Sequence, residues 1–272
     1  MTDVTIWISL TIFMLLMFSM RKNPFIALKS FVHNLYSSRK FLIHFVALLG
    51  VLMINKVELW IELKIPKQPD FTSIIYKLEG NFIPLFQQLF LHPIVTFITT
   101  FFYIVVFPTL MIVSILLYSY QKNDKLFYAV CYAIMINYII AMPFYLFFPV
   151  VEVWSFLPNV HFLMSQVFPS FEIDYRPLSG LDNCFPSLHT SISVTIATIA
   201  LSSGNKFWSR FTVFSSAFII FSIFYLGIHW IVDMVGGVIL GVAAAKLGLL
   251  ISSGISVKSY MTTQSKERSY SE

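Results

Sequence analysis

Residues 211–228 read FTVFSSAFIIFSIFYLGI, and beyond His229 and Trp230 the chain continues with IVDMVGGVILGVAAAKLGLLIS over 231–252. Each run is close to the roughly 20 apolar residues that a helix needs to cross the hydrocarbon core of a bilayer. Apart from Tyr225, ionisable side chains in this stretch are confined to His229, Asp233 and Lys246. The stretch therefore predicts two membrane-spanning helices with polar groups at their junction.

The composition of the whole chain agrees with a membrane protein. Of 272 residues, 57% are hydrophobic, 17% aromatic and 11% charged, whereas about 25% are charged in an ordinary soluble domain. So few charges exclude a water-soluble enzyme, and such high hydrophobicity excludes a disordered chain.

The net charge of +5 is explained by basic cytoplasmic loops. The sequence has no basic stripe interleaved with aromatic residues, so it does not indicate a nucleic-acid partner. Cys131 and Cys184 are far apart and indicate neither a disulfide framework nor a cysteine metal site.

Seven apolar stretches approach the length of a span, and they are 4–20, 41–55, 93–119, 126–151, 189–203, 211–228 and 231–252. Because the first, second and fifth are short, we predict an all-α integral membrane protein with a bundle of six or seven transmembrane helices. Apolar residues also recur at helical spacing in 25–36 and 71–90, which predicts helices lying flat in the headgroup layer. Gly236, Gly237 and Gly241 indicate close helix packing.

The loops predict an orientation. Basic residues outnumber acids in 21–40, 121–125, 204–210 and the tail after 252. In 56–92 four lysines are balanced by four acids, and in 152–188 acids outnumber the single arginine. Basic loops stay in the cytoplasm. We therefore expect the N-terminus outside, the tail inside, and the 152–188 loop facing the exterior of a bacterial plasma membrane or the lumen of an organelle.

Ionisable groups at membrane depth are costly and usually functional. His44 lies near the end of its span, where we expect a neutral, hydrogen-bonded imidazole. His229 and Asp233 would share one face of a helix, and the predicted topology puts them at the same outer rim as His189. An aspartate beside a histidine fixes its tautomer and raises its basicity, so that the imidazole can act as nucleophile or general base.

The run NCFPSLHT over 183–190 adds a second element to this site. Pro186 fits the first turn of a helix, and that helix would aim free amides and the Ser187 hydroxyl at the headgroup layer, as phosphate sites do. The pattern favours phosphoryl chemistry on a lipid. A metal site and a purely structural polar cluster remain the alternatives from these residues alone.

Residues 176–237 resemble the type 2 phosphatidic acid phosphatase superfamily of membrane lipid phosphatases and phosphotransferases. Its first signature ends in Arg-Pro, as in Arg176-Pro177, and its second is Pro-Ser-Gly-His, which here is PSLH over 186–189. Its third has a histidine and an aspartate with three residues between them, as in His229 and Asp233. The resemblance implies a vanadium-haloperoxidase-like helical core, with 1–92 as N-terminal spans and interfacial segments, 93–252 as catalytic core, and 253–272 as a flexible cytoplasmic tail.

This sequence departs from the family at the phosphate-binding cations. Pro169 stands where the first signature has lysine, and Ser222-Ile223 stands where the third has Ser-Arg. Strong charge-assisted bonds to a dianionic phosphomonoester are thereby reduced, which favours a phosphodiester donor. The run 183–189 is similar to the inositolphosphotransferase-like branch, of the inositol phosphorylceramide synthase type. Lys77, in the outer interfacial segment, is a candidate replacement cation.

The resemblance also implies roles for single residues. His229 would form a phosphohistidine, Asp233 would orient it, and His189 would protonate the leaving group and then activate an alcohol or water. Arg176, Ser187 and backbone amides would hold the phosphoryl oxygens, with no metal and no cofactor. The expected partners are a lipid phosphate or phospholipid, an alcohol acceptor for a transferase, and the membrane itself.

Two functions of other classes stay open beside this lipid phosphatase or phosphotransferase. One is a non-catalytic lipid-binding or transport protein with the same bundle, which would tolerate substitution of both histidines. The other is a metal-dependent membrane oxidoreductase, which would contain stoichiometric iron.

Overall fold

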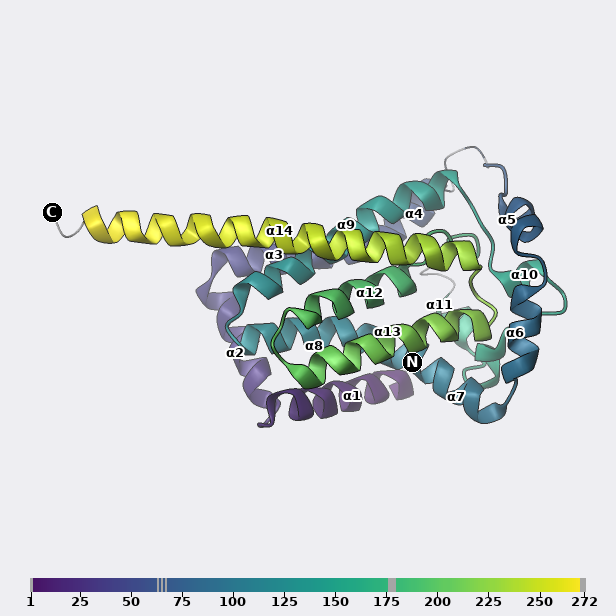
Figure 1. The fold of residues 1–272 in the computed structure, drawn as a ribbon, viewed down its shortest axis with the longest axis horizontal. Helices are drawn as coiled ribbons and strands as arrows, with labels where there is room; N and C mark the ends of the chain where they lie inside the picture. The colour runs from purple at the N-terminus through teal and green to yellow at the C-terminus, as the bar shows by residue number, and fades with distance from the viewer. Residues whose placement is uncertain (1, 63, 65, 67, 176–179, 270–272) are drawn as a thin grey trace.

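The computed structural model describes residues 2–62, 64, 66, 68–175 and 180–269. In this part of the chain the regular structure is helical, apart from an isolated parallel bridge between Val150 and Asn183. The helices shown in Figure 1 are α1 (Thr2–Met20), α2 (Phe25–Ser37), α3 (Arg39–Leu52), α4 (Ile54–Glu62), α5 (Thr72–Glu79), α6 (Phe82–Phe90), α7 (Pro93–Phe101), η1 (Phe102–Val106), α8 (Phe107–Tyr120), α9 (Asp124–Phe147), α10 (Val153–Phe156), η2 (Leu163–Gln166), α11 (Phe171–Tyr175), α12 (Leu188–Leu201), α13 (Lys206–Tyr225) and α14 (Ile231–Ser269).

The predicted all-α membrane class is confirmed. Among the described residues, five segments are long and apolar enough to cross a membrane, namely Asp3–Met20, Pro93–Tyr120, Asp124–Phe147, Lys206–Tyr225 and Ile231–Gly254. The pair α2 and α3, bent by 107°, passes the same test together and raises the number to six. The expected span 189–203 is α12, an apolar helix of 14 residues. Because α8, α9, α13 and α14 enclose it, α12 is a core helix with little need for lipid contact.

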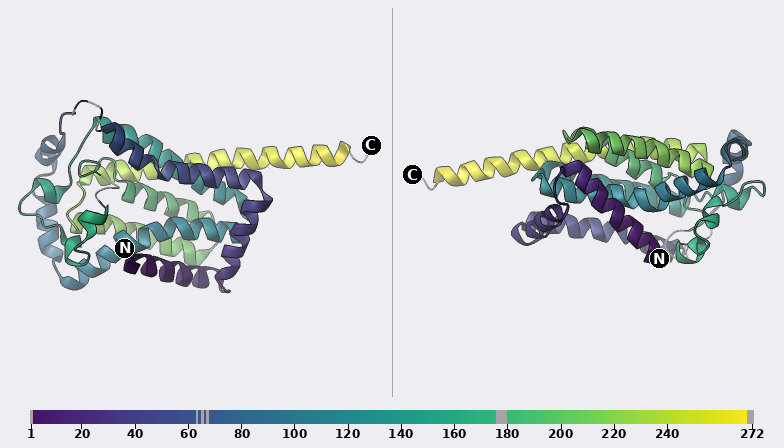
Figure 2. Two further views of the ribbon diagram at one scale, coloured as in Figure 1. Left: turned by 180° about the vertical axis from the view of Figure 1, so that it is seen from behind. Right: turned by 90° about the horizontal axis from the view of Figure 1, so that it is seen from below.

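The two predicted surface segments lie across opposite ends of the bundle (Figures 1 and 2). At one end is α2, together with the basic 21–40 loop, the turns that follow α8 and α12, and the extension of α14. At the other end are α5 and α6, which replace the single segment 71–90 because Gly80, with φ +60°, ends α5. The backbone of α14 stays helical to Ser269 and projects beyond the bundle. The domain boundaries at 92 and 252 stay a prediction.

Close backbone approach joins α14 to α12 and α9, as the glycine pattern predicted. A Cβ atom on Gly241 would lie 2.4 Å from the Ser191 carbonyl oxygen. At the same level the Thr195 hydroxyl donates to the Gly241 carbonyl (3.0 Å), and Asn137 of α9 donates to that hydroxyl (2.9 Å). Buried polar groups thus find partners across three helices, as a membrane interior requires.

The span from Pro93 to Tyr120 contains one irregular turn, which lines the cavity described in the next subsection. Pro108 has no amide hydrogen, and its ring conflicts with the carbonyl four residues earlier in a regular helix. The chain accommodates it with the π-helical turn η1, immediately before α8. Such turns are frequent at functional sites, and this one carries Tyr103 and Ile104 on the cavity wall.

We predict that Gly241→Val destabilises the protein by about 1–3 kcal/mol, because the new side chain overpacks the contact between α12 and α14. Thermal unfolding of purified protein in detergent would measure the loss. Gly254→Val, on the same helix with nothing within 4 Å of its Cβ position, is the matched control. Equal melting temperatures for the two variants would contradict the prediction.

Candidate active site

The turn between α13 and α14 builds the central contact of the site. Gly227, with φ +75°, lets the chain reverse direction after α13, and His229 precedes α14, which begins at Ile231. The Nδ1 atom of His229 lies 3.3 Å from Oδ2 of Asp233, and the Trp230 amide donates to the same oxygen at 2.9 Å. The predicted pair is therefore formed although only Asp233 is within the helix.

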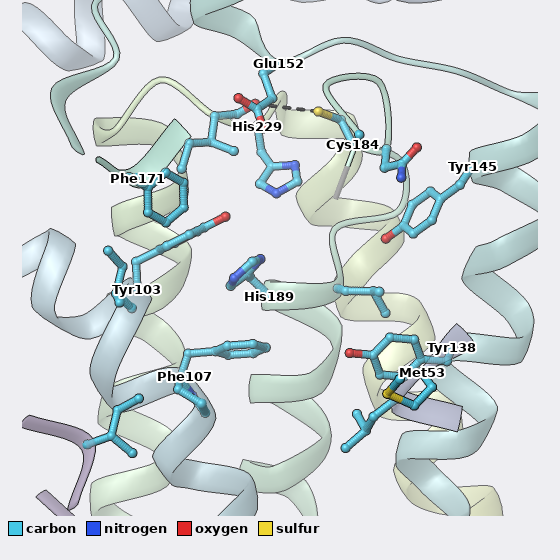
Figure 3. Close-up of a pocket in the computed structure, with 18 residues that line it drawn as sticks. Met53, Tyr103, Phe107, Tyr138, Tyr145, Glu152, Phe171, Cys184, His189 and His229 are labelled. Carbon is cyan, nitrogen blue, oxygen red and sulfur yellow. Dashed lines mark hydrogen bonds between the residues drawn. The ribbon is translucent and has the colours of Figure 1, made fainter. Parts of the chain in front are cut away.

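This pair is buried and oriented. His229 is 5% exposed and Asp233 is 0% exposed. An Asp233 carboxylate accepting from Nδ1–H leaves the lone pair of His229 on Nε2. Nε2 has no hydrogen-bond partner among the described residues, and the ring of His229 points into the cavity (Figure 3). The arrangement supplies one oriented imidazole nitrogen for chemistry.

His189 faces the pair from the start of α12. Its ring stacks on Tyr103 of η1 at 4.0 Å between centroids and contacts Phe107 at 4.3 Å. The centroids of the His189 and His229 rings are 6.4 Å apart, close enough for one small group to contact both. The Ser187 amide donates to the Asp233 carbonyl at 3.1 Å, which ties the start of α12 to the start of α14.

A cavity of about 570 Å³ contains both histidines (Figure 3). Its polar part carries the histidines, Glu152, Asn183 and Cys184, and its apolar part lies below them towards Phe107 and Met53. The other lining residues are Ile8, Leu52, Tyr103, Ile104, Pro108, Tyr138, Tyr145, Phe171, Gly180, Leu188 and Ile228. The cavity therefore suits an amphipathic molecule.

The segment that follows α9 forms hydrogen bonds with the turn that carries His229. The amides of Val153 and Trp154 donate to the carbonyls of Ile228 (3.2 Å) and Gly227 (2.9 Å). The buried Trp230 returns a bond from its indole Nε1 to the Val151 carbonyl, at 2.9 Å. With its backbone groups paired in this way, the turn that carries His229 is fixed without regular secondary structure.

Asn183, on the wall of the cavity, is held by a carboxyl group that the sequence patterns did not single out and that does not itself line the cavity. The Asn183 amide donates to both carboxylate oxygens of Glu58, at 3.0 and 3.1 Å. Burial raises the pKa of Glu58 to about 7, against the lowering effect of the Asn183 bond. Glu58 belongs to α4, far from Asn183 in the chain, so no local pattern could join them.

The proposed substrate-binding residues are not gathered in the cavity. Ser187 is buried as the N-cap of α12 and accepts from the Thr190 amide at 3.4 Å, and it does not line the cavity. Lys77 is exposed on α5. Arg176 lies outside the described residues. Pro186 precedes the N-cap, so α12 begins later than the sequence suggested. The binding roles of Ser187, Lys77 and Arg176 stay predictions.

Ile223 and Pro169 stand at the two positions where the family has a cation, and both have uncharged, apolar side chains. Ile223 is 0% exposed, and its carbonyl accepts from the His229 amide at 3.2 Å, so it supports the turn through its backbone. Pro169 is exposed in the loop before α11. His44 has both ring nitrogens bonded at 2.7 Å, to Lys40 and Tyr132, which confirms the expected hydrogen-bonded histidine.

Glu79 is a second carboxyl group whose contacts the sequence did not predict. Its two carboxylate oxygens accept from the amides of Ile231 and Val232, both at 2.7 Å. Burial raises its pKa and these two bonds lower it. Because 152 residues separate Glu79 from Ile231, the sequence showed it only as one acid in an outer loop.

Three buried residues could hold a metal by distance alone. Single ligand atoms of Cys184, His229 and Asp233 all lie within 4.8 Å of one another. These atoms already have protein partners, because Nδ1 of His229 contacts Oδ2 of Asp233 and the Cys184 thiol lies 3.8 Å from the Ile228 carbonyl oxygen. The hydrogen bond between His229 and Asp233 accounts for the closeness of these two side chains.

We predict that the purified protein, incubated with equimolar Zn²⁺ and desalted, retains far less than one zinc per chain. Cys184→Ala should retain the same small amount, because the thiol is not a ligand. Elemental analysis of both proteins makes the comparison. Stoichiometric zinc or iron in the wild type that is lost in Cys184→Ala would establish a metal centre instead.

Comparison with known proteins gave a match to a family model. A sequence model described as the PAP2 superfamily matches residues 75–247, from α5 into α14, and so includes both histidines and Asp233. No curated protein and no solved structure matches the chain.

Proposed function

The chain belongs to the PAP2 superfamily, and from this membership we propose that it is a membrane enzyme acting on a phosphorylated lipid. It would cleave or transfer a phosphoryl or phosphoalcohol group through a phosphohistidine at His229. The observation that carries the proposal is the buried contact between His229 and Asp233, facing His189 across one cavity.

The geometry supports a two-step reaction. In the first step, Nε2 of His229 attacks phosphorus, and the bond from phosphorus to the leaving oxygen breaks. His189, protonated at that stage, gives its proton to the departing alkoxide. In the second step, neutral His189 takes a proton from water or an alcohol, whose oxygen attacks phosphorus and releases His229. Asp233 keeps the Nδ1 proton in place in both steps.

The apolar part of the cavity supports a lipid substrate. Ile8 of α1 and Leu52 of α3 line it, and both helices lie outside the range matched by the family. These two helices pack on different partners, α1 on α8 and η1, and α3 on α9. We propose that an acyl or prenyl chain lies against Ile8 and Leu52, with its phosphate between the histidines.

The missing cations favour a diester donor within this reaction class. Ile223 and Pro169 supply no positive charge, so a phosphodiester, with one negative charge, would be held more easily than a phosphomonoester. We therefore propose phosphoalcohol transfer to an alcohol acceptor, as the similarity of 183–189 to the inositolphosphotransferase-like branch suggests. The basic loops lie at the end of the bundle opposite the site, which supports an active site on the exterior or luminal face.

The first test measures turnover in mixed micelles with a chelator present. Labelled phosphatidate, prenyl diphosphate, phosphatidylglycerol and phosphatidylinositol are offered with and without an acceptor alcohol or ceramide. We expect an acceptor-dependent phosphodiester product from the wild type, and a loss of roughly a thousandfold or more in His229→Ala, since a deleted nucleophile is rarely replaced.

The matched control for that test is His161→Ala, whose side chain is exposed at the same end of the protein and should be dispensable. Free phosphate as the product would identify a phosphatase. Full turnover by folded His229→Ala would remove the assigned nucleophile. A folded wild type that turns over no donor would favour the lipid-binding or transport alternative.

The second test concerns the lipid chain. Leu52→Trp should lower kcat/KM for a long-chain donor by about tenfold or more, because a larger side chain fills the apolar part of the cavity. A short-chain donor should be affected much less. Leu49→Trp, one turn away on α3 with a 46% exposed side chain, is the control. The same loss for both donors would show that the chain binds elsewhere.

A further inference from the structure

We propose that Glu79 is a positioning residue of this site, and that its carboxylate fixes the first turn of α14 and thereby the relation of His229 to Asp233. The proposal rests on the proposed function for its catalytic consequence. It goes beyond the family signatures, because Glu79 belongs to none of the three motifs on which the resemblance depends. Glu79 does not line the cavity, so it would act through the turn and without touching substrate.

The contact is bidentate and specific to the start of α14. One carboxylate oxygen of Glu79 accepts from the Ile231 amide and the other from the Val232 amide, both at 2.7 Å. Asp233 accepts from the next amide back, that of Trp230, at 2.9 Å. Three consecutive amides that have no partner inside the helix are thus divided between two carboxylates.

Because Glu79 accepts two of these three amides, Asp233 can also contact His229. A carboxylate at a helix start is attracted by the exposed amides and the helix dipole. Glu79 accepts hydrogen bonds from the Ile231 and Val232 amides, so Asp233 accepts from the Trp230 amide alone. The Oδ2 atom of Asp233 that accepts this bond lies 3.3 Å from Nδ1 of His229. Without Glu79, two part-buried amides would need another acceptor, and Asp233 is a carboxylate of the same turn.

Glu79 can hold the turn because α5 is itself anchored. At the start of α5, the Phe71 amide donates to the Pro149 carbonyl (3.1 Å), and the Thr72 hydroxyl accepts from the Val151 amide (2.9 Å). Near its end, the ring of Tyr76 packs edge-on against Trp230, with centroids 6.3 Å apart. The helix that lies across this end of the bundle in Figure 1 therefore presents Glu79 from a fixed base.

The test uses the full chain in micelles with three variants. Glu79→Gln keeps the shape but replaces one acceptor by a donor that opposes an amide hydrogen. Ile231→Pro removes one donor from the other side of the contact, at a first-turn position where proline is tolerated in a helix. Ser73→Ala, on the exposed face of α5, is the control.

The readouts are kcat and KM per folded molecule, and hydrogen exchange of the amides in 229–236. For Glu79→Gln and Ile231→Pro, we expect kcat to fall roughly 10- to 100-fold with KM within about threefold, because the reacting atoms lose alignment while substrate still binds. The remaining amides of the turn should exchange at least about tenfold faster. Ser73→Ala should match the wild type in both readouts.

A purely structural role would lower the folded fraction and leave kcat per folded molecule unchanged, and that result would overturn the proposal. Unchanged exchange in both variants would overturn it as well. If the wild type turns over no donor, the proposed function falls, and faster exchange in both variants would still establish that Glu79 holds the turn. Should Glu79→Gln fail to fold, Ile231→Pro decides by the same criteria.

Discussion

The first turn of α14 is the element around which this site is organised. In a membrane protein a backbone amide without a partner is expensive, because little water is available to replace the missing bond. Here Asp233 and Glu79 receive the amides of Trp230, Ile231 and Val232. The same carboxylate that satisfies Trp230 also contacts His229. One local requirement of the helix start therefore gives the imidazole its orientation.

Close packing of α14 against α12 fixes the second half of the site. Because Gly241 has no side chain, the two helices approach until its Cα faces the Ser191 carbonyl. Where α12 and α14 begin, the Ser187 amide donates to the Asp233 carbonyl. His189 follows Ser187 by two residues, so its distance from His229 depends on this helix pair. Tyr103, on the π-helical turn before Pro108, then sets the tilt of the His189 ring.

The cavity combines two environments that serve different parts of one substrate. The end that contains the two histidines is polar, and the far end is lined by apolar residues such as Ile8, Leu52 and Phe107. Burial of His229 and Asp233 strengthens the electrostatic contact between them. An amphipathic lipid phosphate would match both ends, whereas a small polar metabolite would leave the apolar end without contacts.

Much of this protein follows from the sequence alone. Apolar runs of span length determine the all-α membrane class, because the bilayer accepts helices whose backbone bonds are internal. Spacing also predicted the pair of His229 and Asp233, since residues four apart meet across one turn, and the glycine contacts of α14. Only the tertiary structure decided that α12 is an enclosed core helix, that Ser187 is a buried cap, and that Glu79 and Asn183 bond to residues more than a hundred positions away. Local periodicity carries no information on such contacts, because they depend on how α5 and α4 lie against the end of the bundle.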